Sequence, residues 1–140
     1  MAAKDIFHDA LVHSLQNDGW TVTHEPLSLK VGGTDLFVDV GAERFVTAIK
    51  GTERIAVEVK SFVRLSAVQD LKEAVGQFVL YEDALSVSPA NSDRVLYLGV
   101  RQETFDSVFV DDIGQLILQN RRVRLVVFDP DLEVVTRWIP

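Results

Sequence analysis

The segment Arg54–Lys60 constrains the fold more than any other part of this chain. It reads Arg-Ile-Ala-Val-Glu-Val-Lys, with its isoleucine and two valines at every second position. Side chains of a β-strand alternate between its faces, so the apolar residues would face a core while Glu58 and Lys60 stand side by side on the opposite face. We therefore expect a sheet built around this strand, with a carboxylate and an ammonium group next to each other.

The remaining periodicity predicts an α/β fold with a mixed sheet. Apolar spacings of three and four residues indicate helices, and the pattern Ser66-x-x-Gln69 is a capping box that opens the longer one. Alternating or continuous apolar runs indicate strands. The predicted elements are helices over 3–18 and 66–85, strands over 20–31, 35–49, 54–60, 94–100, 123–128 and 133–139, and short helices near 103–109 and 112–120. Their order is α-β-β-β-α-β, followed by helical material and two C-terminal strands.

The hairpin before Glu58 leaves two acidic candidates open. A connection over 50–53, with Gly51-Thr52 at its tip, would place Phe45 opposite Glu58 and Glu43 opposite Lys60. Gly41 interrupts the preceding strand and suggests a bulge. Asp39 would reach Glu58 only through such a bulge or bend, so hairpin geometry leaves Glu43 as its rival.

Length and composition restrict the class of protein. A chain of 140 residues fits one domain, over 1–140, and its lack of cysteine excludes disulfide scaffolds and thiolate zinc sites. Three histidines without any cysteine argue against a transition-metal cluster. The N-terminus resembles no signal peptide and no apolar run is long enough to span a membrane, so we expect a cytoplasmic protein.

The net charge argues against an autonomous nucleic-acid binder. Fourteen Lys and Arg against 21 Asp and Glu give −7, whereas such proteins are usually basic. Any contact with DNA would therefore need a metal ion, a basic partner subunit, or a local basic patch, which we expect around Lys60 and Arg64.

Glu58 and Lys60 match the needs of a metal-dependent phosphodiesterase. Mg²⁺ prefers one or two carboxylates plus water and phosphate oxygens, and a nearby cation can orient the attacking water. An acid-x-Lys tripeptide should occur roughly 0.8 times by chance in this composition, so the motif alone is weak. Alternatively, Glu58 and Lys60 belong to the ordinary polar face of a half-exposed strand. Asp39 could likewise be present because Asp is common in turns and at solvated strand ends.

Two further places could contribute to such a site. Gln77 and Tyr81 lie four residues apart on the longer predicted helix, hence on one face, a pairing expected only about 0.1 times by chance. Gln77 could hold a water or a phosphate oxygen, or simply bond a neighbouring strand. His8 and Asp9 on the first helix could add an acid or a phosphate contact, or be plain surface residues.

The motifs together resemble a known family. The element order, the Asp before a hairpin, Glu58-x-Lys60 and Gln77-x-x-x-Tyr81 resemble the restriction-endonuclease-like PD-(D/E)xK core. Short stretches of sequence, spread over essentially the whole chain, are similar to the XisH family, the fdxN-element excision controlling factors. They are Lys-Asp-Ile-Phe-His at 4–8, Asp-Gly-Trp at 18–20, Val-Asp-Val-Gly-Ala-Glu at 38–43, Ile-Ala-Val-Glu-Val-Lys-Ser-Phe at 55–62, Gly-Gln at 76–77, Ile-Gly-Gln-Leu at 113–116 and Val-Phe-Asp-Pro at 127–130.

The resemblance implies residue roles with two departures. It implies Asp39 and Glu58 as metal ligands, Lys60 as the cation that orients water and Gln77 as the helix contributor. Val38 stands where the motif has proline, and the first helix lacks the usual Glu, so that Asp5, His8 or Asp9 would substitute.

These considerations leave two main functional hypotheses. The first is a Mg²⁺- or Mn²⁺-dependent endonuclease-like protein that acts in excision of a DNA element, with a site-specific recombinase and a companion, XisI, as implied partners. The second is a non-catalytic assembly factor that binds XisI or the recombinase, which the acidic balance favours. A nuclease of toxin–antitoxin type held by a companion would share the chemistry of the first, and a homo-oligomer is compatible with each.

Overall fold

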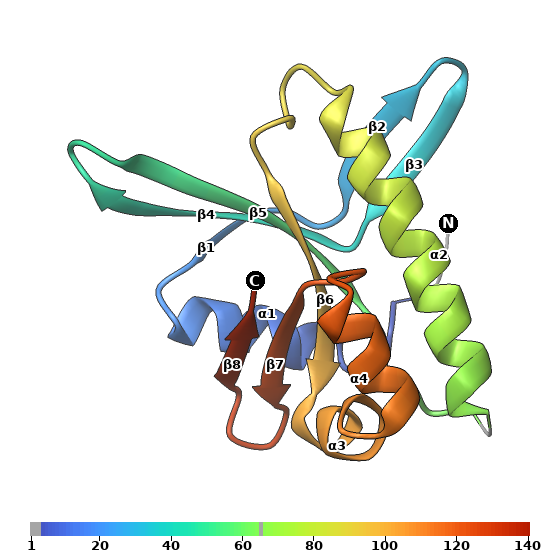
Figure 1. Cartoon of the computed structure of the whole chain (residues 1–140). Helices are drawn as coiled ribbons and strands as arrows, with labels where there is room; N and C mark the ends of the chain where they lie inside the picture. Colours follow the sequence, from blue (N-terminus) through green and yellow to red (C-terminus); the bar gives the residue numbers. More distant parts are fainter. Residues whose placement is uncertain (1–3, 65) are drawn as a thin grey trace.

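The computed structural model describes residues 4–64 and 66–140, so residue 3, where the first predicted helix begins, lies outside it. It shows a six-stranded sheet in the order β1-β4-β5-β6-β7-β8 and a separate β2–β3 hairpin (Figure 1). The elements are α1 (His8–Asn17), β1 (Thr21–His24), β2 (Leu27–Val31), β3 (Thr34–Val38), β4 (Val40–Thr47), β5 (Gly51–Val59), α2 (Ala67–Ser86), β6 (Val95–Arg101), α3 (Gln102–Thr104), the π-helical segment η1 (Phe105–Phe109), α4 (Asp112–Gln119), β7 (Leu125–Asp129) and β8 (Val134–Ile139).

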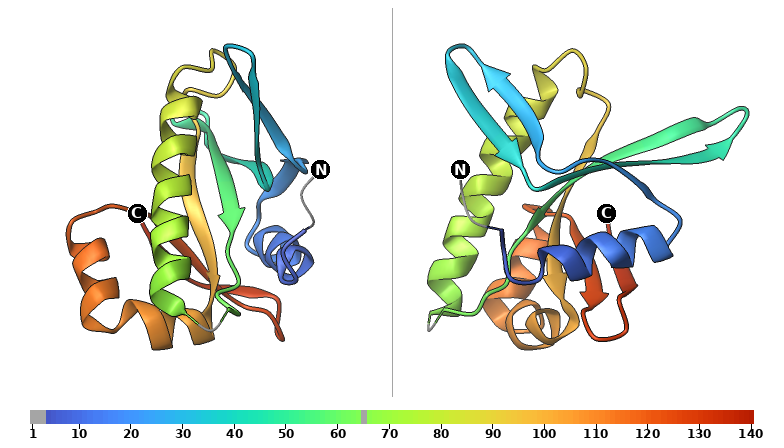
Figure 2. Two further views of the ribbon diagram at one scale, coloured as in Figure 1. Left: turned by 90° about the vertical axis from the view of Figure 1, so that its right-hand side faces the viewer. Right: turned by 180° about the vertical axis from the view of Figure 1, so that it is seen from behind.

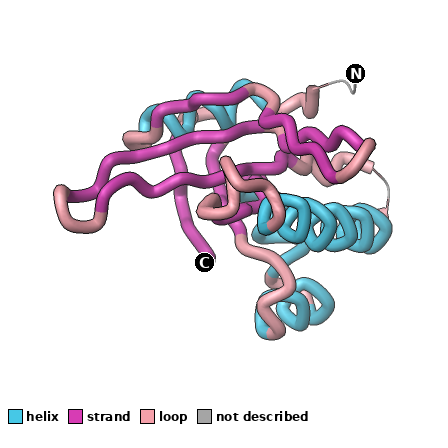
Figure 3. Tube along the Cα trace, turned by 90° about the horizontal axis from the view of Figure 1, so that it is seen from above, coloured by secondary structure: helices cyan, strands magenta, loops and turns pink. Residues whose placement is uncertain are grey.

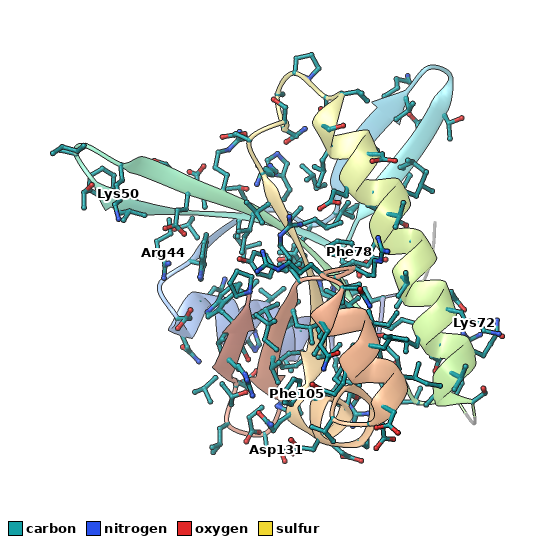
Figure 4. All side chains as sticks on the ribbon, viewed as in Figure 1. Arg44, Lys50, Lys72, Phe78, Phe105 and Asp131 are labelled. Atoms are coloured by element: carbon teal, nitrogen blue, oxygen red, sulfur yellow. The ribbon has the colours of Figure 1, made fainter. Side chains whose placement is uncertain are left out.

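Helices cover both faces of the sheet, with α1 on one face and α2 on the other (Figure 2). Val57 of β5 is buried in the core beside α1, whereas Ala56 is buried in the core beside α2. Phe78 points from α2 toward the sheet while Lys72 points away from it (Figure 4). Glu58 and Lys60 therefore lie on the α2 side of β5, under a helix rather than on an open face.

The connections explain the mixed pairing of the sheet. β5 and β6 are parallel because α2 carries the chain back across the sheet between them, and α3, η1 and α4 do the same between β6 and β7. β4–β5 and β7–β8 are antiparallel. Both buried C-terminal strands that the apolar runs predict, near 94–100 and 123–128, are confirmed as β6 and β7.

α2 is the longest helix and begins where the capping box predicts. The Ser66 hydroxyl accepts a hydrogen bond from the Gln69 N–H at 3.1 Å, which satisfies one of the free donors of the first turn.

In the described part of the chain no helix is both long and apolar enough to cross a membrane.

Two predicted strands are each divided in the structure. The strand expected over 20–31 forms β1 and β2, and the one expected over 35–49 forms β3 and β4 with a bend at Asp39. β2 and β3 leave the main sheet as their own hairpin because Leu27 and Val38 pack into the core on the α2 side. The bend expected within 20–31 is a complete break between two strands of different sheets, and the interruption expected at Gly41 lies at Asp39 instead.

The expected register of the β4–β5 hairpin is also wrong. Phe45 pairs with Thr52 and Glu43 with Arg54, rather than with Glu58 and Lys60. The turn occupies 48–50, earlier than predicted, and Gly51 follows it with φ +73°, a conformation in which glycine is favoured.

Gly41 has a different role from the predicted bulge. The β4–β5 register runs through Gly41 without a shift, and the irregularity lies in β1 between Val22 and His24. A Cβ at Gly41 would lie 3.2 Å from His24 side-chain atoms and 3.4 Å from Arg94 Nη1. Glycine therefore allows these two side chains to approach the sheet closely.

Two helical glycines provide a matched test of the packing. A Cβ at Gly114 of α4 would lie 2.1 Å from the Val108 carbonyl oxygen, whereas a Cβ at Gly76 of α2 meets no atom within 4 Å. We expect Gly114→Ala to lower the free energy of unfolding by about 1–3 kcal/mol because α4 must move off η1. Gly76→Ala should raise it by about 0.5–1 kcal/mol through helix propensity. Urea unfolding measures both, and equal effects of the two substitutions would contradict this packing.

Candidate functional site

Asp39 and Glu58 are held against each other at the bend between β3 and β4. The pairing of Val40 with Val57 places Asp39 beside Glu58. The Asp39 N–H donates to Glu58 Oε1 at 3.2 Å, and Asp39 Oδ2 accepts a hydrogen bond from the Val59 N–H at 2.8 Å. The two carboxyl groups therefore meet at the bend at Asp39, without a bulge at Gly41.

Burial dominates the electrostatics of this carboxyl pair. Desolvation raises the pKa of Glu58 to about 9, with further contributions from the charge of Asp39 and a side-chain hydrogen bond with it. The hydrogen bond from the Asp39 N–H, and then the charge of Lys60, oppose the rise. Desolvation also raises the pKa of Asp39, opposed mainly by the hydrogen bond from Val59. The pair thus retains a proton at neutral pH, and a cation between the two groups would favour its release.

Lys60 follows the last residue of β5 and reaches toward α2. Its Nζ donates a hydrogen bond to Glu73 Oε1 at 3.0 Å. Arg64 binds the other Glu73 oxygen and also Asp70. Hydrogen bonds from Lys60 and Arg64 hold the pKa of Glu73 below its usual value. Glu73 therefore remains ionised and fixes the position of the Lys60 ammonium group.

Glu73 and Asp70 are two further residues next to the site that were not predicted from the sequence, although their spacing on the helix was a usable signal. Glu73 lies four residues before Gln77 and three after Asp70, so all three belong to one side of α2. Asp70 is buried, which is rare for a carboxylate without a charged partner, and here Arg64 supplies that partner.

Gln77 and Tyr81 continue the same side of α2. Gln77 is half-buried, one turn after Glu73 and one turn before Tyr81. Burial raises the pKa of Tyr81, and the charges of Glu58 and Asp39 add to that rise. The predicted helix face is therefore turned toward the carboxyl pair, and Tyr81 lies close enough for the charges of Glu58 and Asp39 to affect its pKa.

The segment around the first helix contributes Asp5 and His8. Asp5 Oδ2 accepts a hydrogen bond from the Ser61 N–H at 2.9 Å, and its charge contributes to the raised pKa of Asp39. His8 is only 4% exposed, so the surface alternative for it is wrong, and its Nε2 lies 2.9 Å from Glu25 Oε2.

Two acidic candidates lie outside the site. Glu43 pairs with Arg54, four residues along β4 from Asp39, so the hairpin argument for it as a neighbour of Lys60 is wrong. Asp9 is exposed and forms an ion pair with Lys4 at 3.5 Å.

The carboxyl pair fits a hard divalent cation. In residues 4–64 and 66–140 no group of three or more His, Cys, Asp or Glu side chains is arranged to hold a metal. A divalent cation bound here would have Asp39 and Glu58 as its protein ligands, with water and substrate oxygens completing the shell, as Mg²⁺ prefers. Two partly buried carboxyl groups held against each other, each with a pKa raised first by desolvation, are a suitable donor set for such a cation.

Proteins similar to this chain match it over nearly its full length. The crystal structure of an XisH family protein from Nostoc punctiforme PCC 73102 is 38% identical, has a TM-score of 0.85, and covers 97% of this chain and 100% of its own. That of an fdxN element excision controlling factor protein from Anabaena variabilis is also 38% identical, with a TM-score of 0.85 and coverage of 98% and 100%. No curated protein sequence matches. The family model described as XisH protein matches residues 1–136, and the chain belongs to the XisH family.

Proposed function

We propose that this protein is an element-excision controlling factor with a Mg²⁺-dependent, endonuclease-like centre that hydrolyses DNA phosphodiester bonds. The observation that carries the proposal is the pair formed by Asp39 and Glu58, with Lys60 next to it on the same side of β5. Without the β2–β3 hairpin, the order α1-β1-β4-β5-α2-β6 is that of a restriction-endonuclease-like PD-(D/E)xK core, which supports the assignment.

Each residue has a chemical role in this proposal. Asp39 and Glu58 hold Mg²⁺ or Mn²⁺, which when bound would lower the pKa of water and stabilise charge on the phosphate. The Lys60 ammonium group orients the attacking water, and Glu73 keeps that group in place. Gln77, on the α2 side that faces the pair, would hold a phosphate oxygen or the water.

The biological setting is proposed from the family. The protein from Anabaena variabilis is described as an fdxN element excision controlling factor. By analogy, we propose a DNA substrate, with an XisI-like companion and a site-specific recombinase as partners.

The acidic balance supports the competing proposal of a non-catalytic assembly factor. The chain carries a net charge of −7, and two cations that follow β5, Lys60 and Arg64, are bound to Glu73 and Asp70. A bound divalent ion or a basic partner would have to offset this charge before a DNA backbone could approach. Metal binding therefore separates the two proposals.

Substitution of Glu58 should change how stability depends on pH. Because folding raises the pKa of Glu58 from 4.5 to about 9, the folded state binds its proton more tightly than the unfolded state. The resulting stability is fully present below pH 4.5 and is lost as the pH rises toward 9. In EDTA at pH 8, Glu58→Gln should be more stable than wild type by on the order of 1 kcal/mol or more. Urea unfolding at several pH values checks this, and parallel pH profiles would contradict it.

Metal binding and cleavage should respond differently to two substitutions. Glu58→Gln should abolish Mn²⁺ binding and cleavage because it removes a ligand. Lys60→Met should retain the ion but lower cleavage by about 10²–10³-fold, since its cation acts on the transition state. Glu43→Gln is the matched control and should change neither. Titration calorimetry with Mn²⁺ and cleavage of branched and linear DNA, with and without an XisI-like companion, measure these effects.

One combination of results would contradict the catalytic proposal. If wild type binds no divalent ion with DNA and companion present, and both Glu58→Gln and Lys60→Met support element excision in cells, the catalytic proposal fails. The assembly factor then replaces it.

A further inference from the structure

A groove lies between the first turns of α2 and the segment that joins η1 to α4. Both α2 and α4 lie on the same face of the sheet (Figures 2 and 3). The groove has a volume of about 520 Å³ and is called the α2–α4 groove below. Its lining residues are Ala67, Val68, Leu71, Ser107, Val108, Val110, Asp111, Asp112, Ile113 and Gly114. They belong to α2, η1, α4 and the connection between η1 and α4, so the walls of the groove are helical.

Apolar side chains in and next to the α2–α4 groove are exposed to solvent. Val68 of α2 is 44% exposed, and Val110 and Ile113 are each 51% exposed. Leu116, three residues after Ile113 and on the same side of α4, is 57% exposed and extends the apolar surface beyond the groove. Exposed apolar surface that gathers at one place on a soluble protein marks an interaction site.

The charged residues that line the groove are both carboxylates. Asp111 and Asp112 are exposed, and no ion pair within residues 4–64 and 66–140 involves either of them. Asp111 occupies the N-cap position of α4, but its side chain makes no capping hydrogen bond. Lys72 follows Leu71 on α2, but it is not a lining residue and points away from the sheet (Figure 4). The groove therefore combines apolar walls with an acidic edge.

This acidic edge determines which class of molecule the groove can accept. DNA and membranes rich in anionic lipids are negatively charged, so two carboxylates without cation partners would repel both. A protein segment that carries Lys or Arg beside apolar side chains complements the edge and the walls together. Because no strand edge lines the groove, the segment that fits it is an amphipathic helix, which lays its apolar face between the two walls.

The helices of this chain do not supply such a segment. In the described residues, α1, α3, η1 and α4 contain no Lys or Arg, and α2 contains only Lys72. A second copy of the chain would therefore offer the groove no basic helix.

We propose that the α2–α4 groove binds a basic amphipathic helix of a different protein. The exposed apolar side chains contact its apolar face, and Asp111 and Asp112 contact its cations. The groove adjoins the candidate site along α2, because Leu71 lines the groove and Glu73, two residues further along, binds Lys60. A partner bound there would bring positive charge next to the site of a chain whose net charge is −7.

Two synthetic peptides test the selection by charge. A fluorescein-labelled peptide of about 15 residues, built from Leu and Lys in a helical pattern, should bind the full chain with a Kd of about 10–100 μM. The same peptide with Glu in place of Lys should bind at least about tenfold more weakly, because the acidic edge repels it. Fluorescence anisotropy at physiological salt measures both affinities.

Substitutions in the groove test where the Leu/Lys peptide binds. Ile113→Ser should weaken its binding about tenfold or more, because an exposed apolar contact is lost. The double substitution Asp111→Asn and Asp112→Asn should weaken it about threefold or more.

Matched controls make the same chemical changes elsewhere on the surface. Ile49→Ser removes an isoleucine that is 99% exposed in the β4–β5 turn. The double substitution Asp35→Asn and Asp83→Asn removes two exposed carboxylates, one in the β2–β3 hairpin and one near the C-terminal end of α2, both far from the first turns of α2 (Figure 1). Neither control should change the affinity for the Leu/Lys peptide.

NMR locates the bound peptide independently of these affinities. Amide resonances of residues 67–71 and 107–114 should shift on titration, and those of the β2–β3 hairpin should not. Glu58→Gln should leave peptide binding unchanged, so the result does not depend on the metal centre. The proposal is overturned if the Leu/Lys peptide does not bind, if the Glu peptide binds equally well, or if the groove substitutions have no effect. A dimer that Ile113→Ser dissociates, or DNA that displaces the peptide from the groove, would also overturn it.

Discussion

The hydrogen bond from the Val59 N–H to the Asp39 carboxylate is the contact on which the candidate site depends. The strand β4 begins at Val40, so beyond that residue its backbone no longer pairs with β5. The side chain of Asp39 satisfies the Val59 donor instead, as a partly buried N–H requires. The break at Asp39 thus ends the β4–β5 pairing, separates the β2–β3 hairpin from the main sheet and holds Asp39 against Glu58.

The charged groups on the α2 side of the Asp39–Glu58 pair are bound to one another, whereas in the described residues the two carboxyl groups of the pair have no such partner in common. On the α2 side, Glu73 and Asp70 bind Lys60 and Arg64, which gives a fixed network rather than a free basic patch. Between the strands, two carboxyl groups face each other and are protonated more readily than usual. We propose that this acidic protein presents a local position that favours a cation, although its surface as a whole does not favour DNA.

Local patterns predicted the parts of the fold that depend on nearby residues. Alternation identified β5, and the Ser66 cap identified the start of α2. The β4–β5 register was missed because it depends on where the turn forms, and the glycine at 51 closes an earlier turn than expected. Asp39 followed only from the family resemblance, since hairpin geometry favoured Glu43. Glu73 was missed because acidic helix residues usually face solvent, and only the tertiary contact with Lys60 distinguishes this one.

The proposed chemistry requires Asp39 and Glu58 to hold a divalent ion together. An anomalous difference map from a crystal soaked in Mn²⁺ would show that ion. We expect a peak between the two carboxylates, within about 2.0–2.3 Å of an oxygen of each, with water completing the shell. A well-ordered site without such a peak, with Glu58 still bonded to the Asp39 N–H, would contradict this metal site.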